Sequence, residues 1–188
     1  KGPGFGQGSV DGPALSARFN QPHGMVKMGD GALIIADRHN DRLRKLQNGV
    51  VTTLAGGEYG FADGPAAAAR FHHPSGLALD AQGRVLVADE SNHRIRRVTS
   101  EGETTTIGGA DGPRIRGYAR GIVTARDGTV FVSTFGGNNN KILTLSADGI
   151  PTTLAGGEDG FADGRGAAAS FKFPVGIAEG PDGHIYVA

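Results

Sequence analysis

The chain has 188 residues, and its 19 basic and 19 acidic side chains give a formal net charge of zero, which argues against nucleic-acid partners. The absence of cysteine excludes disulfides and thiolate metal sites without fixing the cellular compartment. No apolar run is long enough to cross a membrane, and the 33 glycines gather at recurring turns, which indicates an ordered chain.

One motif recurs with a period of about 50 residues. Residues 61–64 return letter for letter as 161–164, together with most of their surroundings. An Asp-Gly pair marks each copy, at positions 11, 63, 111 and 163. A fixed period of this length indicates one supersecondary unit that is stacked repeatedly, because no single unit can bury its apolar face alone.

Each copy contains short runs rich in β-branched and apolar residues, bounded by Gly, Asn, Asp or Ser, which predicts strands. In the first copy the runs are 24–28, 32–37, 42–46 and 50–54. In the second they are 76–80, 84–89, 94–98 and 104–107. In the third they are 121–125, 129–134, 141–146 and 151–155, and the fourth copy holds 176–178 and 184–188.

Four strands joined by tight turns form an antiparallel meander, and meanders with this period predict an all-β chain of β-propeller type. The expected single domain, 1–188, holds three full four-stranded blades and part of a fourth, at about 20–56, 72–109, 118–157 and 172–188. Propellers close with roughly 4–8 blades, so we expect remaining blades or an adjacent chain to complete the ring.

The repeats resemble a known family. The second copy reads Pro74-x-Gly76-Leu77, then Val85-Leu86-Val87-Ala88-Asp89, then Asn92-His93-Arg94-Ile95, and the first and fourth copies match its opening. This pattern is similar to the NHL repeat, and the long connectors resemble those of multidomain NHL proteins. The resemblance implies a β-propeller that mostly binds proteins. Some members of the family bind RNA, and a minority of relatives are metal-dependent lyases or hydrolases.

Asp37 and Arg42 flank a four-residue turn, and Asp89 and Arg94 repeat this spacing, whereas the third copy lacks both residues. The joint loss predicts that each Asp–Arg pair is a structural clamp across a hairpin. The alternative is an anion-binding or catalytic carboxylate.

The connector between the first two copies has Asp63-Gly64-Pro65 followed by four alanines, which predicts a short capped helix. Phe71, at the end of this connector, is expected to fill the groove between neighbouring blades, as are Phe19 and Phe171. The alternative, a calcium loop, is disfavoured because each connector offers few of the oxygen ligands that calcium requires.

No catalytic, cofactor-binding or metal-binding residues are predicted. The six histidines occupy unmatched places in the repeats, whereas a propeller metal site draws ligands from matching places on several blades. The basic runs 42–45 and 94–97 are interpreted as solvated outer strands. A phosphate-tracking stripe for RNA is the alternative, weakened by the scarcity of aromatic residues.

The sequence therefore predicts a non-enzymatic scaffold with a protein partner. RNA binding and a metal-dependent lyase or hydrolase activity remain as alternatives. The loops between second and third strands differ between copies, so they are the candidate partner-binding surface. Its residues are His39, Asn40, Asp41, Glu90, Asn92, His93, Phe135, Asn138 and Asn139. Phe135 is expected either to contact the partner or to fold back onto the neighbouring blade.

Overall fold

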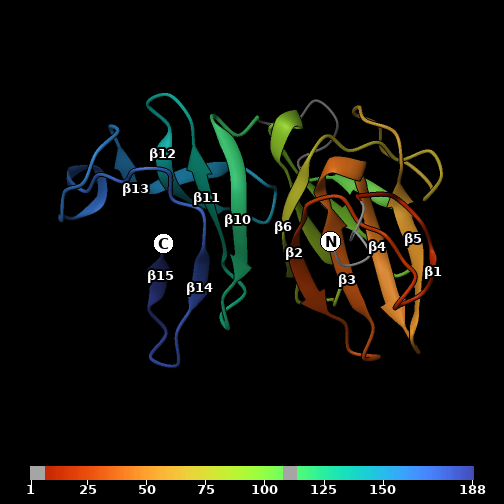
Figure 1. Ribbon diagram of the computed structural model, residues 1–188. Helices are drawn as coiled ribbons and strands as arrows, with labels where there is room; N and C mark the ends of the chain where they lie inside the picture. Colours follow the sequence, from red (N-terminus) through yellow and green to blue (C-terminus); the bar gives the residue numbers. More distant parts are fainter. Residues whose placement is uncertain (1–6, 108–113) are drawn as a thin grey trace, which may run out of the picture.

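The computed structural model describes residues 7–107 and 114–188, and it builds one antiparallel sheet from each repeat (Figure 1). The first sheet contains β2 (Pro22–Lys27), β3 (Leu33–Asp37), β4 (Arg42–Gln47) and β5 (Val50–Gly56), and β1 (Gly12–Pro13) is added beside β5. The second contains β6 (Pro74–Leu79), β7 (Val85–Asp89), β8 (Arg94–Val98) and β9 (Thr104–Thr106). We call these sheets blade 1 and blade 2.

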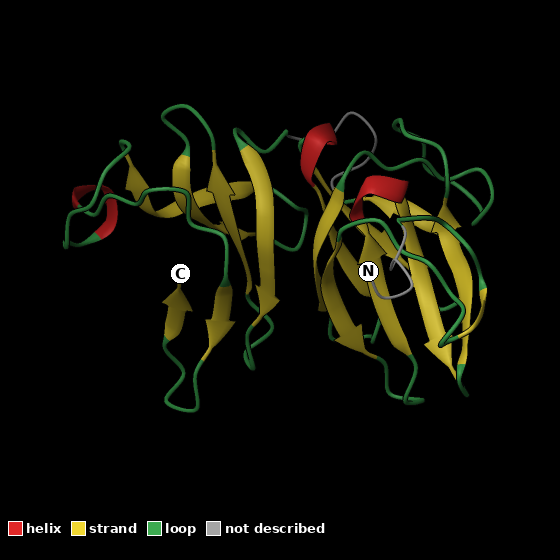
Figure 2. Ribbon diagram, in the orientation of Figure 1, coloured by secondary structure: helices red, strands yellow, loops and turns green. Residues whose placement is uncertain are grey.

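Blade 3 contains β10 (Tyr118–Thr124), β11 (Val130–Phe135), β12 (Asn140–Leu145) and β13 (Pro151–Gly157), and blade 4 contains β14 (Ile177–Glu179) and β15 (Ile185–Val187). The helical segments of the described residues are three short 3₁₀ turns, η1 (Arg38–Asn40), η2 (Glu90–Asn92) and η3 (Gly166–Ala168) (Figure 2). The predicted all-β array of three four-stranded blades and part of a fourth is confirmed. The Asp-Gly pair at 111–112 and the predicted end of blade 2 at 108–109 lie outside the described residues. No helix in the described ranges is long and apolar enough to span a membrane.

The first strands of consecutive blades contact one another, β2 with β6, β6 with β10 and β10 with β14. Glycine occupies the same place in three of these strands, at positions 24, 76 and 121. A Cβ atom at these positions would overlap the backbone carbonyl oxygen of the next blade, at Ser75, Arg120 and Val175 in turn. Glycine is therefore required because the blades approach closely at this point.

Apolar clusters fill the space between adjacent blades. One joins blades 1 and 2 through residues that include Leu43, Phe71 and Val87, and another joins blades 2 and 3 through Leu86 and Val132. Phe71 is fully buried, as expected of a residue that fills the groove between blades. Phe19 and Phe171 are only partly buried.

The predicted connector helix is wrong. Residues 65–69 form a single hydrogen-bonded turn, in which the amides of Ala68 and Ala69 donate to the Pro65 carbonyl oxygen. Four alanines are too few to offset the cost of starting a helix. Asp63 does not cap this turn with its side chain. Its carboxylate accepts hydrogen bonds from Arg96 and from Thr106 in blade 2.

The predicted Asp–Arg clamps are wrong in their arginine: each aspartate forms its ion pair with the arginine two residues further along the strand. Asp37 lies opposite Arg42 in the strand ladder, yet its carboxylate pairs with Arg44 at 2.8 Å. The Arg42 guanidinium instead donates to backbone carbonyl oxygens, at Asn40 and Gly57. Alternate residues of a strand share a face, so the long Arg44 side chain reaches the carboxylate diagonally.

Blade 2 repeats this arrangement, with Asp89 opposite Arg94 on the backbone and paired with Arg96 at 2.7 Å. The side chains of Arg44 and Arg96 are fully buried. The prediction that the basic runs 42–45 and 94–97 are solvated is therefore wrong for Arg44 and Arg96.

Gly76→Ala is predicted to lower the free energy of unfolding by about 1–3 kcal/mol, because the added methyl group overlaps the Arg120 carbonyl oxygen. Gly29→Ala is the matched control, since no atom lies within 4 Å of an added Cβ there. Urea denaturation of both variants gives the measurement, and equal stabilities would contradict the close-approach argument.

Arg96→Ala is predicted to cost about 3–5 kcal/mol, because it leaves the buried Asp89 carboxylate without its ionic partner. Arg165→Ala, at an exposed position, is expected to stay within about 0.5 kcal/mol of the parent chain. Thermal and urea denaturation would both detect the difference. A loss below about 1 kcal/mol for Arg96→Ala would show that the pair contributes little.

Candidate binding surface at the upper rim

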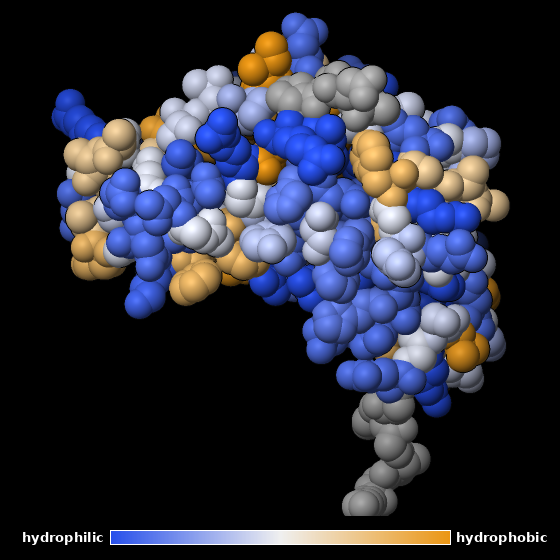
Figure 3. All heavy atoms as spheres, turned by 90° about the horizontal axis from the view of Figure 1, so that it is seen from above, coloured by the Kyte–Doolittle hydropathy of each residue, from blue (hydrophilic) through white to orange (hydrophobic). Residues whose placement is uncertain are grey.

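Three loops between second and third strands lie on one side of the molecule, at the top of the view (Figure 1). They are residues 38–41 with η1, 90–93 with η2, and 136–139. The β-ladders place the starts of β2, β6 and β10 at the same level, since Pro22 pairs with Asp37, Pro74 with Asp89 and Tyr118 with Phe135. We call these loops, strand starts and the adjoining connectors the upper rim. Seen from above, its surface is mostly hydrophilic, with apolar residues in separate spots (Figure 3).

A charged network joins three blades at the upper rim. Two guanidinium nitrogens of Arg38 in blade 1 donate to the Glu90 carboxylate in blade 2, at 3.3 and 2.8 Å. Arg120, in the first strand of blade 3, lies 3.8 Å from the same carboxylate. The Glu90 side chain is only 5% exposed, so this carboxylate is enclosed by two cations. Such pairing satisfies a buried charge and fixes the loops relative to one another.

Two histidines extend this network. Arg120 Nε donates to His23 Nε2 at 3.3 Å, and Arg38 Nη1 lies 2.7 Å from His39 Nε2. An arginine nitrogen can only donate, so both contacts require an unprotonated Nε2. Burial lowers the pKa of His23 below its ordinary value, and the positive charge of Arg120 lowers it further, while Glu90 acts in the opposite direction.

A first ring array, Tyr59, His72, His73 and His39, lies where the connector meets blade 1. Its neighbouring ring centroids are separated by 5.8 Å, 4.7 Å and 5.0 Å in that order. The His73 amide donates to the Asp41 carboxylate at 2.8 Å, which fixes the backbone of the array. Burial lowers the pKa of His73, and the charge of Arg38 lowers it further.

A second ring array, His93, Tyr118, Phe135 and Phe173, runs from blade 2 to blade 4. Its successive centroid distances are 5.1 Å, 5.4 Å and 6.1 Å. The Arg120 guanidinium lies 5.4 Å from the Phe135 ring centre, a cation–π contact that joins the array to the charged network. Phe135 therefore packs between two neighbouring rings, as the folding-back alternative predicts. Its contact with a partner stays a prediction.

Two of the candidate loop residues, Asn40 and Asn92, use their side-chain amides in hydrogen bonds within the chain. The Asn40 amide donates to Asp37 and to the Gly8 carbonyl oxygen. The Asn92 amide does the same with Asp89 and Gly60. Both side chains hold the connector against the loop, so we assign them a structural role.

Among the remaining candidates Glu90 is buried, whereas His93 and Asn139 are half-buried. His93 Nδ1 lies 2.8 Å from the Gly117 carbonyl oxygen, and Asn139 donates to the Gly136 carbonyl oxygen. Asn138 is exposed. His23 and Arg120 were not identified from the sequence, although the residue that precedes the recurring glycine of each first strand differs between copies. That variation is the signal that would have found them.

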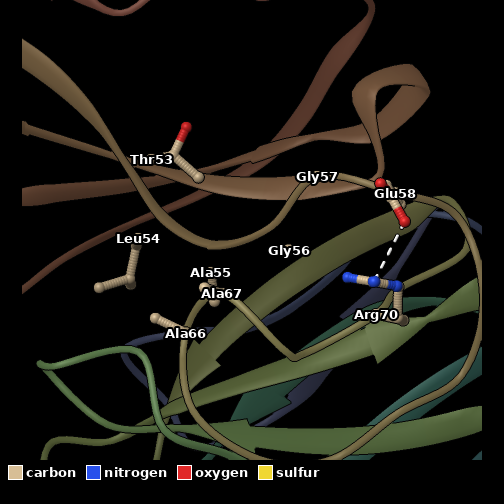
Figure 4. A pocket seen from close by; sticks show the side chains of 9 residues that line it. All are labelled: Thr53, Leu54, Ala55, Gly56, Gly57, Glu58, Ala66, Ala67 and Arg70. Atoms are coloured by element: carbon tan, nitrogen blue, oxygen red, sulfur yellow. Dashed lines mark ion pairs between the residues drawn. The ribbon is translucent and has the colours of Figure 1, made fainter.

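Two hollows adjoin the first ring array. One, of ≈ 670 Å³, is lined by Ser9, His39, Asn40, Asp41, Arg42, Gly57, Glu58 and Tyr59. The other, of ≈ 470 Å³, shares Gly57 and Glu58 and continues between β5 and the connector (Figure 4). An ion pair of 3.1 Å between Glu58 and Arg70 stands on its wall. Within residues 7–107 and 114–188, no group of three or more His, Cys, Asp or Glu side chains is arranged to hold a metal ion.

The lowered pKa of His23 predicts a pH dependence of stability. The folded chain binds the His23 proton less readily than the unfolded chain, so stability is lost as the pH falls below the ordinary value of 6.5. His23→Gln should lose less stability than the parent chain between about pH 7 and pH 5. Glu90→Gln should move the His23 resonance midpoint to still lower pH in an NMR titration. A midpoint above 6.5 in the parent chain would contradict the assignment.

Comparison with known proteins supports the fold and the repeat. Residues 71–98 match the model of the NHL repeat. The chain is 36% identical over 107 residues to protein SUPPRESSOR OF QUENCHING 1, chloroplastic, of Arabidopsis thaliana, which covers 55% of this chain and 10% of that protein. It is also 32% identical over 111 residues to NHL repeat-containing protein 2 of Bos taurus, and this match covers 55% of this chain and 15% of that protein. The chain thus spans a small part of these relatives.

Solved structures show the same architecture. A virginiamycin B lyase from Staphylococcus aureus aligns with a TM-score of 0.62 at 17% identity, covering 89% of this chain and 48% of the lyase. A gluconolactonase from Xanthomonas campestris aligns with a TM-score of 0.64 at 19% identity, covering 90% and 55%. At these identities the likeness concerns the fold alone. The repeat motif, the blade architecture and the matched relatives agree: the chain carries an NHL repeat at residues 71–98 within a β-propeller fold, and it is similar to NHL-repeat proteins.

Proposed function

We propose that this chain is a non-enzymatic scaffold that binds a protein partner through the upper rim. The observation that supports this most directly is the second ring array beside the charged network. Tyr118 is 41% exposed and Phe173 is 56% exposed, and Arg120 lies next to the Phe135 ring between them. Exposed aromatic rings beside an arginine are typical of the residues that contribute most to protein interfaces.

The geometry also limits the entropic cost of binding. Arg38, Glu90 and Arg120 join loops from three blades, and the ring contacts hold Tyr118 and Phe173 on either side of Phe135. Side chains that are already positioned lose less conformational freedom when a partner binds. Because the upper rim is already rigid, we expect it to bind a folded or extended segment of the partner without rearranging its own loops.

The partner is expected to carry acidic groups together with apolar ones. Arg38 and Arg120 share the single carboxylate of Glu90, so the centre of the network carries an excess positive charge. A carboxylate from the partner would balance that charge, and an apolar side chain would cover the exposed rings.

RNA binding would use the same rings and arginines, by stacking bases on them. The net charge of zero makes it the weaker alternative, since phosphate binding depends on a basic surface. The lyase and the lactonase share only the fold with this chain, which gives no argument for their reactions.

Tyr118→Ala is predicted to weaken binding of the protein partner by about fivefold or more, because an exposed ring at the centre of the surface is removed. The partner would be identified by cross-linking to the parent chain, and its Kd measured by calorimetry for each variant. Leu15→Ala is the matched control, because Leu15 is 98% exposed and lies beside the lower turn at Gly49, away from the upper rim.

Two outcomes would count against the proposal. Unchanged affinity for Tyr118→Ala, with weaker binding for Leu15→Ala, would place the interface elsewhere. Submicromolar binding of a mixed-sequence single-stranded RNA, lost in Tyr118→Ala, would favour the RNA function instead.

A further inference from the structure

The first strands of the blades carry different residues just before their recurring glycine. The residue is His23 in β2, Ser75 in β6 and Arg120 in β10, and β6 lies between the other two strands (Figure 1). Ser75 is fully buried, and its hydroxyl oxygen lies 3.2 Å from the Arg120 carbonyl oxygen. The short side chain on the middle strand leaves room for the longer side chains of His23 and Arg120 to meet.

Arg120 leaves most of its guanidinium donors unused. Within the described residues it donates one hydrogen bond, from Nε to His23 Nε2 at 3.3 Å, and its two terminal nitrogens donate none. The Glu90 carboxylate lies 3.8 Å from the same Nε, which is beyond hydrogen-bond distance. The Arg120 side chain is 26% exposed, so an anion from solution can reach the planar donors of its guanidinium.

The Glu90 carboxylate is used mainly by the other arginine. Arg38 donates to both of its oxygens, at 3.3 and 2.8 Å, and also contacts the neutral Nε2 of His39 at 2.7 Å. The charge of Arg120 therefore has a more distant anion and a neutral imidazole as its partners. A carboxylate would accept the Arg120 donors more strongly than the imidazole does, because hydrogen bonds between ionised groups are shorter and stronger.

Charged groups from three other elements face His23. They are Arg120 of β10, Arg38 of η1 and Glu90 of η2. Burial lowers the pKa of His23 most, and both arginines lower it further, whereas Glu90 and a hydrogen bond with the Ser75 backbone raise it. Since two cations and one anion surround the ring, an added carboxylate would favour its protonated form.

We propose that Arg120 and His23 form a carboxylate-binding subsite of the upper rim, and that occupation of this subsite takes up a proton on His23. In the empty subsite His23 Nε2 accepts the N–H bond of Arg120. A carboxylate of the partner replaces Nε2 as the acceptor, and the freed Nε2 takes a proton from solvent and donates it in a hydrogen bond to the same carboxylate. This inference rests on the proposed function, because it assigns the subsite to an acidic group of the protein partner.

Proton uptake makes the affinity depend on pH. The lowered pKa keeps His23 unprotonated in the free chain near neutral pH, and a bound carboxylate raises that pKa. Binding and protonation favour each other by reciprocal linkage, so the affinity rises as the pH falls from about 7.5 to about 6. Aspartate side chains of the ligand stay ionised over this range, since their ordinary pKa is about 3.9.

The first experiment measures the proton on His23 directly. The 188-residue chain is titrated by NMR alone, with hexa-aspartate as the acidic probe, and with hexaserine as the neutral control, all at one ionic strength. Hexa-aspartate should raise the midpoint of the His23 resonance by about 0.5 or more, and hexaserine should not move it. A midpoint that hexa-aspartate leaves unchanged or lowers would overturn the proposal.

The second experiment measures the Kd of hexa-aspartate at both ends of this pH range. The parent chain should bind about threefold or more tightly at the lower pH. His23→Gln keeps an oxygen that accepts from Arg120 but cannot be protonated, so it should lose this pH dependence. His184→Gln, at an exposed turn of blade 4, is the matched control and should keep it. Arg120→Gln should weaken binding by about tenfold or more at both pH values.

Three results of the second experiment would overturn the proposal. They are a pH dependence that persists in His23→Gln, a Kd that Arg120→Gln leaves unchanged, and displacement of hexa-aspartate by inorganic phosphate at equal or lower concentration, which would indicate a phosphate site instead.

Failure of this proposal and failure of the proposed function are distinguishable. Loss of the His23 response to hexa-aspartate would overturn the subsite without changing the Tyr118→Ala result for the protein partner. A coupled His23 response, together with partner binding that is insensitive to Tyr118→Ala, would support the subsite and count against the proposed interface.

Discussion

The buried arginine is the interaction on which blades 1 and 2 depend. Arg96 joins the end of one strand through Asp89, the preceding connector through Asp63, and the backbone of the connector at Ala62. A guanidinium that is fully buried must have all its charge and donors satisfied, or the cost of removing it from water would unfold the sheet. The long connectors are consequently ordered by ionic contacts instead of by helix formation.

This constraint also prepares the upper rim. Asp89 accepts a hydrogen bond from the Asn92 amide, which in turn donates to the connector at Gly60, so the loop next to Glu90 is anchored from below. Glu90 is then held where Arg38 and Arg120 can both reach it. The upper rim holds its rings and charges in fixed positions because these hydrogen bonds already fix the loops and connector beneath it.

Blade 3 departs from the rule, and the departure is informative. Thr134 stands at the place of the aspartate and Leu143 at the place of the buried arginine, and Leu143 packs in the apolar cluster between blades 2 and 3. The Thr134 hydroxyl donates to the Asn139 carbonyl oxygen across the hairpin. One blade therefore replaces an ionic centre with an apolar contact and a neutral hydrogen bond. The two losses occur together because an unpaired buried charge would be costly.

The period, the strands and the turns could be predicted from the sequence, because alternating apolar residues and glycine turns are local signals that each repeat restates. The glycines at 24, 76 and 121 were visible as a pattern, although their reason, contact with the next blade, was not. Which arginine binds each aspartate was decided by tertiary structure, since both candidates are arginines on one face of the strand and only Arg44 also meets the connector groups of Asp11, Val10 and Arg18. The contact of His23 with Arg120 joins residues 97 positions apart. No local pattern encodes that separation, because the packing of one blade on the next brings the two side chains together.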